Sequence, residues 1–352
     1  MSRWKTWVGI LVSALAIWWA MRGVDWALVW PALRAADWSL LAVVFALAPV
    51  VNVGARAVRW RILLGPVARV PVTSCASATA VGLMANNVLP ARIGEFVRAY
   101  ALARRERVPT ATAFGSLFLE RMFDGFALVG ILYALRWVVE LPPWANTTAV
   151  VAFWIFVGFA AFQAVLVAWP RKVIGAAQWV RRRIFGGRFE EAVEAALATF
   201  VEGFQLLKRP GLVAISALLG FAQWALVALL FFLGMAAFGL ARQAGFEGAL
   251  FTNSITALGV AAPSSPGFVG TFQAFVVQSL EAFDVDRTIA FSYSLGFHAV
   301  NYLSVTLVGL ICFLREGLSW KEIERSEEEL EREMADEFET GIEPLLERDD
   351  RS

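Results

Sequence analysis

Charged residues and metal ligands are scarce in this sequence. Only 17% of its 352 residues are charged, whereas 59% are hydrophobic. A soluble domain of this length needs a larger charged surface, so the composition excludes an ordinary soluble protein and predicts membrane spans. The chain has two cysteines and one histidine. Such small numbers disfavour a disulfide framework or a histidine-rich metal site, and the cysteines are expected to be small buried apolar side chains.

Tyrosine is also rare, and one common nucleotide-binding motif is missing. Four Tyr stand against 15 Trp and 28 Phe, a balance that suits a lipid-facing protein with aromatic anchors near the membrane interfaces. The phosphate-binding sequence GxxxxGK[ST] does not occur. If the protein transports a substrate, the movement would therefore be driven by a gradient or be a simple equilibration. We expect no cofactor, no metal and no nucleic-acid partner.

Six long apolar stretches predict full membrane spans, because a span needs about 20 apolar residues. Two further apolar stretches, 73–104 and 248–280, are interrupted by Pro, Gly and polar residues and do not read as simple spans. The six uninterrupted stretches are about 6–22, 38–55, 110–138, 148–169, 211–236 and 287–314.

Basic residues are distributed unevenly among the connecting segments. Residues 170–210 contain eight Lys or Arg, 56–69 contain four, and 104–107 read RRER, while 139–147 contain no basic residue. The positive-inside rule places the first three segments in the cytoplasm and the last outside. Six spans satisfy all four constraints in an inner-membrane protein with both termini in the cytoplasm.

The two interrupted stretches must then enter and leave the membrane on one side, which predicts re-entrant helix hairpins. They also resemble each other. TAVG at 79–82 matches TALG at 256–259, and PxxxGxF occurs at both 90–96 and 266–272, offset by 176 or 177 residues. The pattern predicts an inverted-topology repeat, with a chance alignment of small and apolar residues as the alternative. The expected fold is an all-α polytopic membrane protein with about six full spans plus two re-entrant hairpins.

We divide the chain into a transmembrane domain, 1–315, and an acidic cytoplasmic tail, 316–352. Apolar residues in the linker recur at helical spacing and predict a cytoplasmic amphipathic helix. Within the first domain, repeat one covers about 6–138, the linker about 170–210, and repeat two about 148–169 and 211–315.

The tail reverses the charge of the rest of the chain. From Arg315 onward there are six Lys or Arg and 15 Asp or Glu, a net charge of −9, whereas the whole chain has +1. The preceding part therefore carries about +10, which suits a membrane containing anionic lipids. A solvated helix or an unstructured segment is expected for the tail.

Polar residues expected at membrane depth form three groups. They lie in NNVLPARIGEFVRAY (86–100), SLFLERMFDGF (116–126) and GVAAPSSPGFVGTFQ (259–273). Charges within a membrane cost a few kcal/mol each, so they should face the protein interior and pair. The candidate substrate-binding residues are Asn87, Arg92, Glu95, Arg98, Glu120, Arg121, Asp124, Ser264, Ser265 and Gln273.

The functional interpretation of these groups is a central polar cavity. Arg92 and Arg98 would bind an anionic headgroup, since guanidinium binds phosphate through paired hydrogen bonds. Glu95, Glu120 and Asp124 would orient the arginines. The alternative is an internal salt-bridge network that attaches the first hairpin to the third span.

A structural role is expected for five further polar residues. Ser264 and Ser265 are expected to satisfy backbone groups at a hairpin tip rather than act as nucleophiles. Arg56, Arg59 and Arg61 are expected to mark the cytoplasmic end of the second span.

Four segments together resemble the transmembrane family of lysylphosphatidylglycerol synthases, also called flippase-like membrane proteins. The similarity runs over most of residues 6–315, through NVGARAVRWRILL, NNVLPARIGEFVRAYAL, AFGSLFLERMFDG and APSSPGFVGTFQAF. In the two-domain synthases this bundle moves an aminoacylated phospholipid between leaflets, and a soluble C-terminal domain makes that lipid. The resemblance implies lipid translocation or binding. The short acidic tail leaves no room for a synthase domain, which argues against lysyl transfer.

We therefore expect a flippase-like transporter, not an enzyme, for an anionic phospholipid or a polyprenyl-phosphate-linked lipid. One alternative is a membrane enzyme of lipid metabolism that uses Glu120 and Asp124 as acid and base. Another is a non-catalytic scaffold that acts through the tail. Self-association and a basic partner for the tail stay open.

Overall fold

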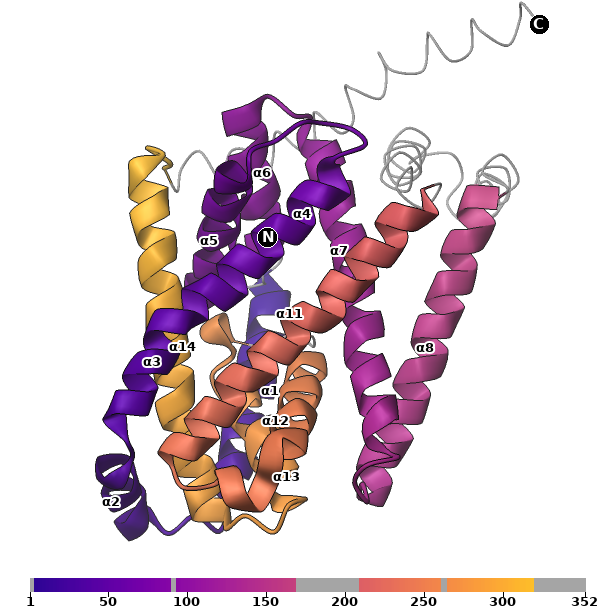
Figure 1. Cartoon of the computed structure of the whole chain (residues 1–352). Coiled ribbons are helices and arrows are strands. Elements are labelled where there is room, and N and C mark those ends of the chain that lie inside the picture. Colours follow the sequence, from indigo (N-terminus) through magenta and orange to yellow (C-terminus); the bar gives the residue numbers. More distant parts are fainter. Residues whose placement is uncertain (1–2, 90–92, 169–208, 261–264, 320–352) are drawn as a thin grey trace, which may run out of the picture.

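The computed structural model is a bundle of helices and describes residues 3–89, 93–168, 209–260 and 265–319 (Figure 1). Every regular element within these residues is helical, and none is a strand. The elements are α1 (Arg3–Met21), α2 (Trp26–Ala35), α3 (Trp38–Pro49), η1 (Val50–Ala55), α4 (Arg56–Leu64), α5 (Val72–Val88), α6 (Gly94–Glu106), α7 (Thr110–Leu135), α8 (Pro143–Ala168), α11 (Pro210–Ala237), α12 (Ala241–Gly259), η4 (Pro266–Phe268), α13 (Thr271–Glu281) and α14 (Arg287–Arg315).

Among the described residues, four helices are long and apolar enough to cross a membrane, and a bent pair would be a fifth. The bent pair joins α1 to α2 at an angle of 88°. The stretch expected at 110–138 forms the 26-residue helix α7, but Glu120, Arg121 and Asp124 stand in its middle. The chain is thus an all-helical, multi-pass membrane protein. The four apolar helices are Trp38–Leu64, Pro143–Ala161, Pro210–Ala237 and Arg287–Arg315.

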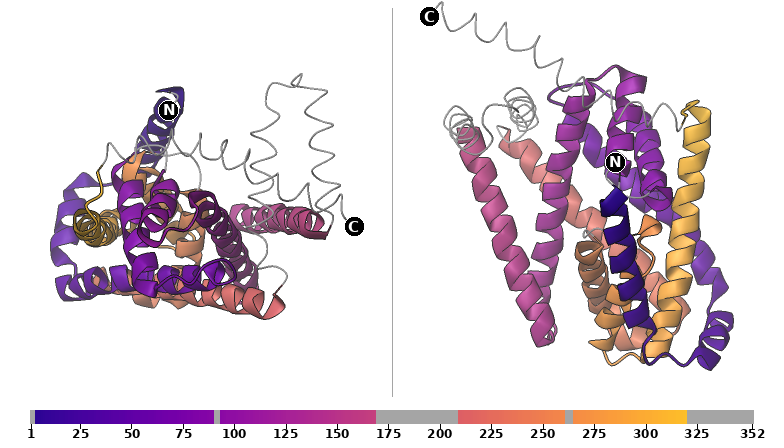
Figure 2. Two further views of the ribbon diagram at one scale, coloured as in Figure 1. Left: turned by 90° about the horizontal axis from the view of Figure 1, so that it is seen from above. Right: turned by 180° about the vertical axis from the view of Figure 1, so that it is seen from behind.

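The outer surface of the bundle is apolar, as a lipid-facing surface should be. Leu218 on α11, Leu314 on α14 and Trp154 on α8 are 69%, 67% and 65% exposed. Helix α8 stands at the edge of the bundle beside α7 (Figure 2). Ring contacts such as Tyr133 with Phe153, whose centroids lie 5.2 Å apart, attach it there. Large exposed apolar side chains over several helices fit acyl chains rather than water.

The second expected span is longer than the sequence indicated, because α3, η1 and α4 form one continuous helix. Pro49 has no N–H to donate to the carbonyl of Phe45, four residues earlier, and a π-helical turn follows at Val50–Ala55. The Ser304 hydroxyl of α14 donates to the Phe45 carbonyl instead. The helix therefore continues to Leu64 and carries its arginines into the bundle.

The first interrupted stretch, 73–104, folds as two helices packed on each other. Gly82 of α5 and Gly94 of α6 bring the backbones together, since a Cβ at position 94 would lie 2.1 Å from the Gly82 carbonyl oxygen. Only glycine permits such an approach. The second stretch, 248–280, forms α12 and α13 with the short η4 before α13. The α5–α6 pair lies in the upper half of Figure 1 and the α12–α13 pair in the lower half.

Two large apolar clusters form most of the core of the described residues, and two smaller clusters complete it. One large cluster contains residues of α1, α2, α3, η1, α7 and α11–α14, the other mainly residues of α4, α5, α6 and α7. Most of the expected linker helix at 170–210 and of the tail at 316–352 lies outside the described residues. The polar site is contributed by elements of both clusters.

We predict that Gly82→Ala destabilises the α5–α6 pair. The new Cβ would lie 2.6 Å from the Gly94 carbonyl oxygen and 2.7 Å from the Arg98 Cβ, so overpacking should cost about 1–3 kcal/mol. The midpoint of thermal unfolding in detergent should fall. Gly158→Ala on α8 is the matched control, because nothing lies within 4 Å of its Cβ position. Equal midpoints for the two variants would refute the close approach.

Candidate functional site

A buried cluster of charges joins three helices in the upper half of the bundle. Glu120 of α7 is fully buried and accepts hydrogen bonds from both terminal nitrogens of Arg98 on α6, at 3.1 and 3.0 Å. Arg59 of α4, also fully buried, lies 3.1 Å from Glu120 and 2.6 Å from Asp124. Paired geometry of this kind is what makes buried charges tolerable in a membrane.

Aromatic side chains complete the cluster. The Arg98 guanidinium lies 4.2 Å from the centre of the Trp60 ring, a cation–π contact that is strengthened where water is excluded. Trp224 of α11 donates its indole N–H to Asp124 at 3.1 Å. The cluster thereby fixes α4, α6, α7 and α11 relative to one another.

The expectation that Arg56 and Arg59 mark the cytoplasmic end of the second span is wrong. Both are buried at 7% and 0% exposure, and both face the carboxylates of α7. Arg61, on the other side of α4, is exposed, as expected for the cytoplasmic end of a span. The sequence could not show this, because the partner of Arg59 lies 65 residues away on another helix.

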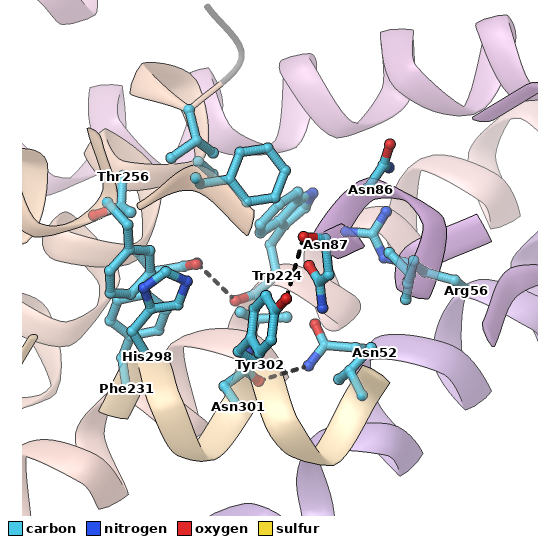
Figure 3. Close-up of a pocket in the computed structure, with 18 of the residues that line it drawn as sticks. Asn52, Arg56, Asn86, Asn87, Trp224, Phe231, Thr256, His298, Asn301 and Tyr302 are labelled. Atoms are coloured by element: carbon cyan, nitrogen blue, oxygen red, sulfur yellow. Dashed lines mark hydrogen bonds between the residues drawn. The ribbon is translucent and has the colours of Figure 1, made fainter. Parts of the chain in front are cut away.

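An amphipathic cavity of about 220 Å³ adjoins the cluster (Figure 3). This is far more than the 10–15 Å³ that one water molecule requires. Arg56, Glu95 and Arg121 contribute charges to its wall. Its neutral polar lining includes Asn52, Asn86, Asn87, Asn253, Thr256, His298, Asn301 and Tyr302, and its apolar lining includes Leu83, Trp224, Val227, Phe231, Val260, Phe268, Phe272 and Val305.

Hydrogen bonds across the cavity connect helices that are far apart in sequence. Asn52 donates to the side-chain oxygen of Asn301 at 3.2 Å, and the Tyr302 hydroxyl donates to the Asn87 carbonyl at 3.2 Å (Figure 3). Asn253, 2% exposed, donates to the Trp224 carbonyl at 3.3 Å. These bonds fix the walls of the cavity without filling it.

Several buried polar atoms in the wall have no hydrogen-bond partner among the described residues. They include the Thr256 hydroxyl and the Nε of both Arg56 and Arg121. Thr256 is 3% exposed. Because buried donors without partners are costly, such groups indicate a place where a ligand or water is bound.

The positive charge of the cluster exceeds its negative charge. Four arginines, at positions 56, 59, 98 and 121, face three carboxylates, at positions 95, 120 and 124. Arg56 is held weakly, since its nearest carboxylate oxygen lies 3.8 Å away. An anion in the cavity would balance the excess.

The candidates from the sequence separate into two layers. Asn87, Glu95 and Arg121 line the cavity, and Arg121 lies 3.2 Å from Asp124 and 3.5 Å from Glu95. Arg98, Glu120 and Asp124 form the buried layer behind it.

The described candidates from 248–280 do not line the cavity, although Asn253, Thr256, Phe268 and Phe272 of the same stretch do. Gln273 is buried behind His298, with its amide nitrogen 3.0 Å from the Nδ1 of His298. The Ser265 hydroxyl donates to the Val269 carbonyl at 3.0 Å, away from the cavity. Arg92 and Ser264 lie outside the described residues.

The lining residues that sequence reasoning missed come mostly from α11 and α12. Trp224 and Phe231 stand in the long apolar helix α11 with no local signal for a site. Asn253 stands in α12, within the stretch that polar residues interrupt. His298 and Asn301 are polar residues within the last expected span, 287–314, and that position is their signal in the sequence. Asn52 could have been found from the π-helical turn it occupies, since such turns gather at functional sites.

We predict that Glu120→Gln strongly destabilises the protein. The change removes the carboxylate shared by Arg59 and Arg98, and breaking a buried ion pair costs about 3–5 kcal/mol. Unfolding in detergent, followed by circular dichroism, should show the loss. Glu281→Gln serves as the control, because its pair with Arg287 is partly exposed and should contribute about 1 kcal/mol or less. An equal loss of stability in the two variants would contradict the prediction that the buried cluster stabilises the fold more than the exposed pair.

Comparison with known proteins finds membrane proteins, in agreement with the long apolar helices of the bundle. The family described as the lysylphosphatidylglycerol synthase TM region matches residues 6–309. A UPF0104 membrane protein from Methanocaldococcus jannaschii is 21% identical over 238 residues, which are 65% of this chain and 92% of that protein. No solved structure matches the chain. Because the match covers most of the sequence, it confirms the resemblance noted from the motifs: the chain belongs to the family of lysylphosphatidylglycerol synthase transmembrane regions.

Proposed function

We propose that the protein is a flippase-like lipid transporter of the inner membrane. Its cavity binds the headgroup of an anionic phospholipid or of a polyprenyl-phosphate-linked lipid and exposes it to each leaflet in turn. The observation that carries the proposal is the pair of arginines, Arg56 and Arg121, in the wall of a cavity that is half apolar. Membership of a lipid-related membrane family supports the same role.

The chemistry of the wall suits a phosphate with an apolar tail. The arginine Nε groups and the Thr256 hydroxyl are unpartnered donors, and guanidinium binds phosphate oxygens in pairs. Leu83, Val227 and Phe231 offer an apolar surface on the same cavity. A lipid with a phosphate headgroup fits this cavity, because the donors can bind its phosphate and the apolar surface can contact its chain.

Helix positions support the proposed inverted repeat. Helices α6 and α13 begin at Gly94 and Thr271, 177 residues apart, and α7 and α14 begin at 110 and 287, again 177 apart. The same offset relates Arg121 to His298, and both line the cavity. In this proposal the α5–α6 and α12–α13 pairs are re-entrant hairpins from opposite sides, within six full spans. Irregular backbone between such helices is tolerated where it lines a cavity.

The distribution of charge supports the proposed orientation. Arg61, Arg69, Arg105 and Arg107 are exposed on α4, on α6 and in the segments after them, whereas the connection 139–147 between α7 and α8 has no basic residue. The positive-inside rule then places both termini in the cytoplasm.

The state of the carboxylates supports a transporter rather than an enzyme. A general base must reach a substrate proton. Glu120 is fully buried between Arg59 and Arg98, and Asp124 lies against Arg59 and Arg121. These carboxylates orient arginines in the proposal and do not take part in chemistry.

We predict that the protein moves fluorescent phosphatidylglycerol between leaflets of proteoliposomes, and that Arg56→Gln and Arg121→Gln each slow the movement about tenfold or more. Loss of one charge-assisted hydrogen bond costs about 1.5–3 kcal/mol. Dithionite quenching of the outer-leaflet probe measures the rate, with a polyprenyl phosphate probe in parallel. Arg61→Gln, on the exposed side of α4, should leave the rate unchanged.

The folded state must be checked in the same samples. Thermal unfolding shows whether each arginine variant still folds, and mass spectrometry of the lipids shows whether any headgroup is altered. Movement unaffected by both arginine variants would refute the cavity as the route. No movement together with a new lipid species would favour a membrane enzyme.

A further inference from the structure

Helix α2 lies across the lower end of the bundle in Figure 1 and does not continue the direction of α1. The two helices meet at 88°. With ten residues, α2 is about 15 Å long, half of what a span of roughly 30 Å requires. It therefore neither crosses the membrane nor extends a helix that does.

Both ends of α2 are fixed. Asp25 caps its first turn by accepting the Ala27 N–H at 3.0 Å, and the Asp25 N–H itself donates to the Thr288 hydroxyl of α14 at 3.1 Å. After α2, the Asp37 N–H donates to the Ala237 carbonyl of α11 at 2.8 Å. The crosswise direction of α2 is thus set by the bundle itself.

One face of α2 packs inward and another is left outside. Val29 is buried, and the Trp26 ring makes an edge contact with Phe291 of α14 at 5.7 Å. On the outer side, Trp30 and Arg34 follow at an interval of four residues, and Trp26, four residues before Trp30, lies at the edge between the two faces. Trp26 and Trp30 are 53% and 59% exposed.

Arginines accompany the exposed indoles. The Arg34 guanidinium lies 5.1 Å from the centre of the Trp30 ring, and that of Arg22 lies 4.6 Å from the Trp18 ring. Neither arginine has a carboxylate partner within the part of the chain that the structure describes. A guanidinium stacked on an indole keeps its N–H edge free for phosphate oxygens.

We propose that α2 is an interfacial helix that lies in the headgroup layer of the leaflet opposite the basic connecting segments. Its tryptophans enter the boundary between headgroups and acyl chains, where indole is favoured. Arg22 and Arg34 bind phosphates of the same leaflet. The partner is the phospholipid surface itself, and the inference does not depend on transport.

The distribution of exposed tryptophan favours a bilayer over a protein partner. The end of α1, which carries Trp18, α2, which carries Trp30, and the start of α3 at Trp38 lie toward the lower end of the bundle in Figure 1. The end of α7 lies toward the same end, and Trp137, which follows it, is 86% exposed. A protein bound to α2 would cover one side only. A membrane interface meets all of these side chains at one depth.

Spin labels can measure the direction of α2 in the full chain in nanodiscs of phosphatidylcholine and phosphatidylglycerol. Labels are placed singly at Ala27→Cys and Ala35→Cys, both exposed and eight residues apart. Cys312 is replaced by serine, while Cys75 is fully buried and can stay. Depth follows from the relative accessibility to oxygen and to a water-soluble nickel complex.

The matched control is Val151→Cys and Phe159→Cys on α8, also exposed and eight residues apart. We expect the two α2 labels to lie at one depth near the phosphates, whereas the α8 labels should differ by roughly 12 Å. A depth difference on α2 as large as that on α8 would overturn the proposal. The proposal would also be overturned if the α2 labels were as accessible to the nickel complex as a label in bulk water. It would likewise be overturned if neither oxygen nor the nickel complex reached them, because a second protein would then cover α2.

A second measurement tests the arginines. The preference of the protein for spin-labelled phosphatidylglycerol over phosphatidylcholine should fall at least twofold in the variant with Arg22→Gln and Arg34→Gln. Arg242→Gln, which removes one exposed positive charge from α12, is compared with each of the two single variants, so that the change in net charge is the same. An unchanged preference in the double variant would overturn the assignment of these arginines to lipid phosphates.

Discussion

Glu120, fully buried in α7 and bound by Arg98 and Arg59, determines how the upper half of the bundle is assembled. A carboxylate at this depth is tolerable only with close cationic partners, and those partners need a carboxylate in return. The requirement places α6 and α4 against α7, although 22 and 61 residues separate the partners in sequence. Gly82 of α5 lies against Arg98 at this point, since a Cβ on it would lie 2.7 Å from the Arg98 Cβ.

The same cluster gives the cavity its chemical character. Its innermost arginines, Arg59 and Arg98, pair with Glu120 and Asp124 at 2.6–3.1 Å, while Arg56 and Arg121 stand at the edge with longer contacts of 3.8 and 3.2–3.5 Å. The opposite wall, from α12 and α14, is neutral. Under the 177-residue offset Asp124 corresponds to Asn301, as Arg121 does to His298. One half of the proposed repeat therefore supplies charge and the other supplies amides and rings.

Sequence reasoning recovered the parts of the structure that depend on local composition. Apolar length located the long helices, and Pro and Gly located the breaks in the two hairpins. The role of Arg59 was predicted wrongly, because a basic residue that follows an apolar run is typical of the end of a span. Its partner Asp124 lies on another helix, and the sequence does not show such a tertiary contact. Trp224 was missed since a single indole in an apolar helix does not reveal which way it faces, and Asn253 was missed because the same holds for one amide among the polar residues of α12. The expectation that Glu120 and Asp124 face the protein interior and pair was confirmed.

The division into tight and weak ion pairs bears on how an anionic headgroup could be moved without unfolding the bundle. If the ligand had to displace Glu120 from Arg59 and Arg98, each passage would require breaking a dry, fully buried network. A phosphate that binds Arg56 and Arg121 instead replaces a long contact at Arg56 and partly exposed contacts at Arg121, so the exchange costs little. The buried pairs, which fix α4, α6, α7 and α11 relative to one another, can then remain closed while a headgroup binds and leaves at the edge of the cluster.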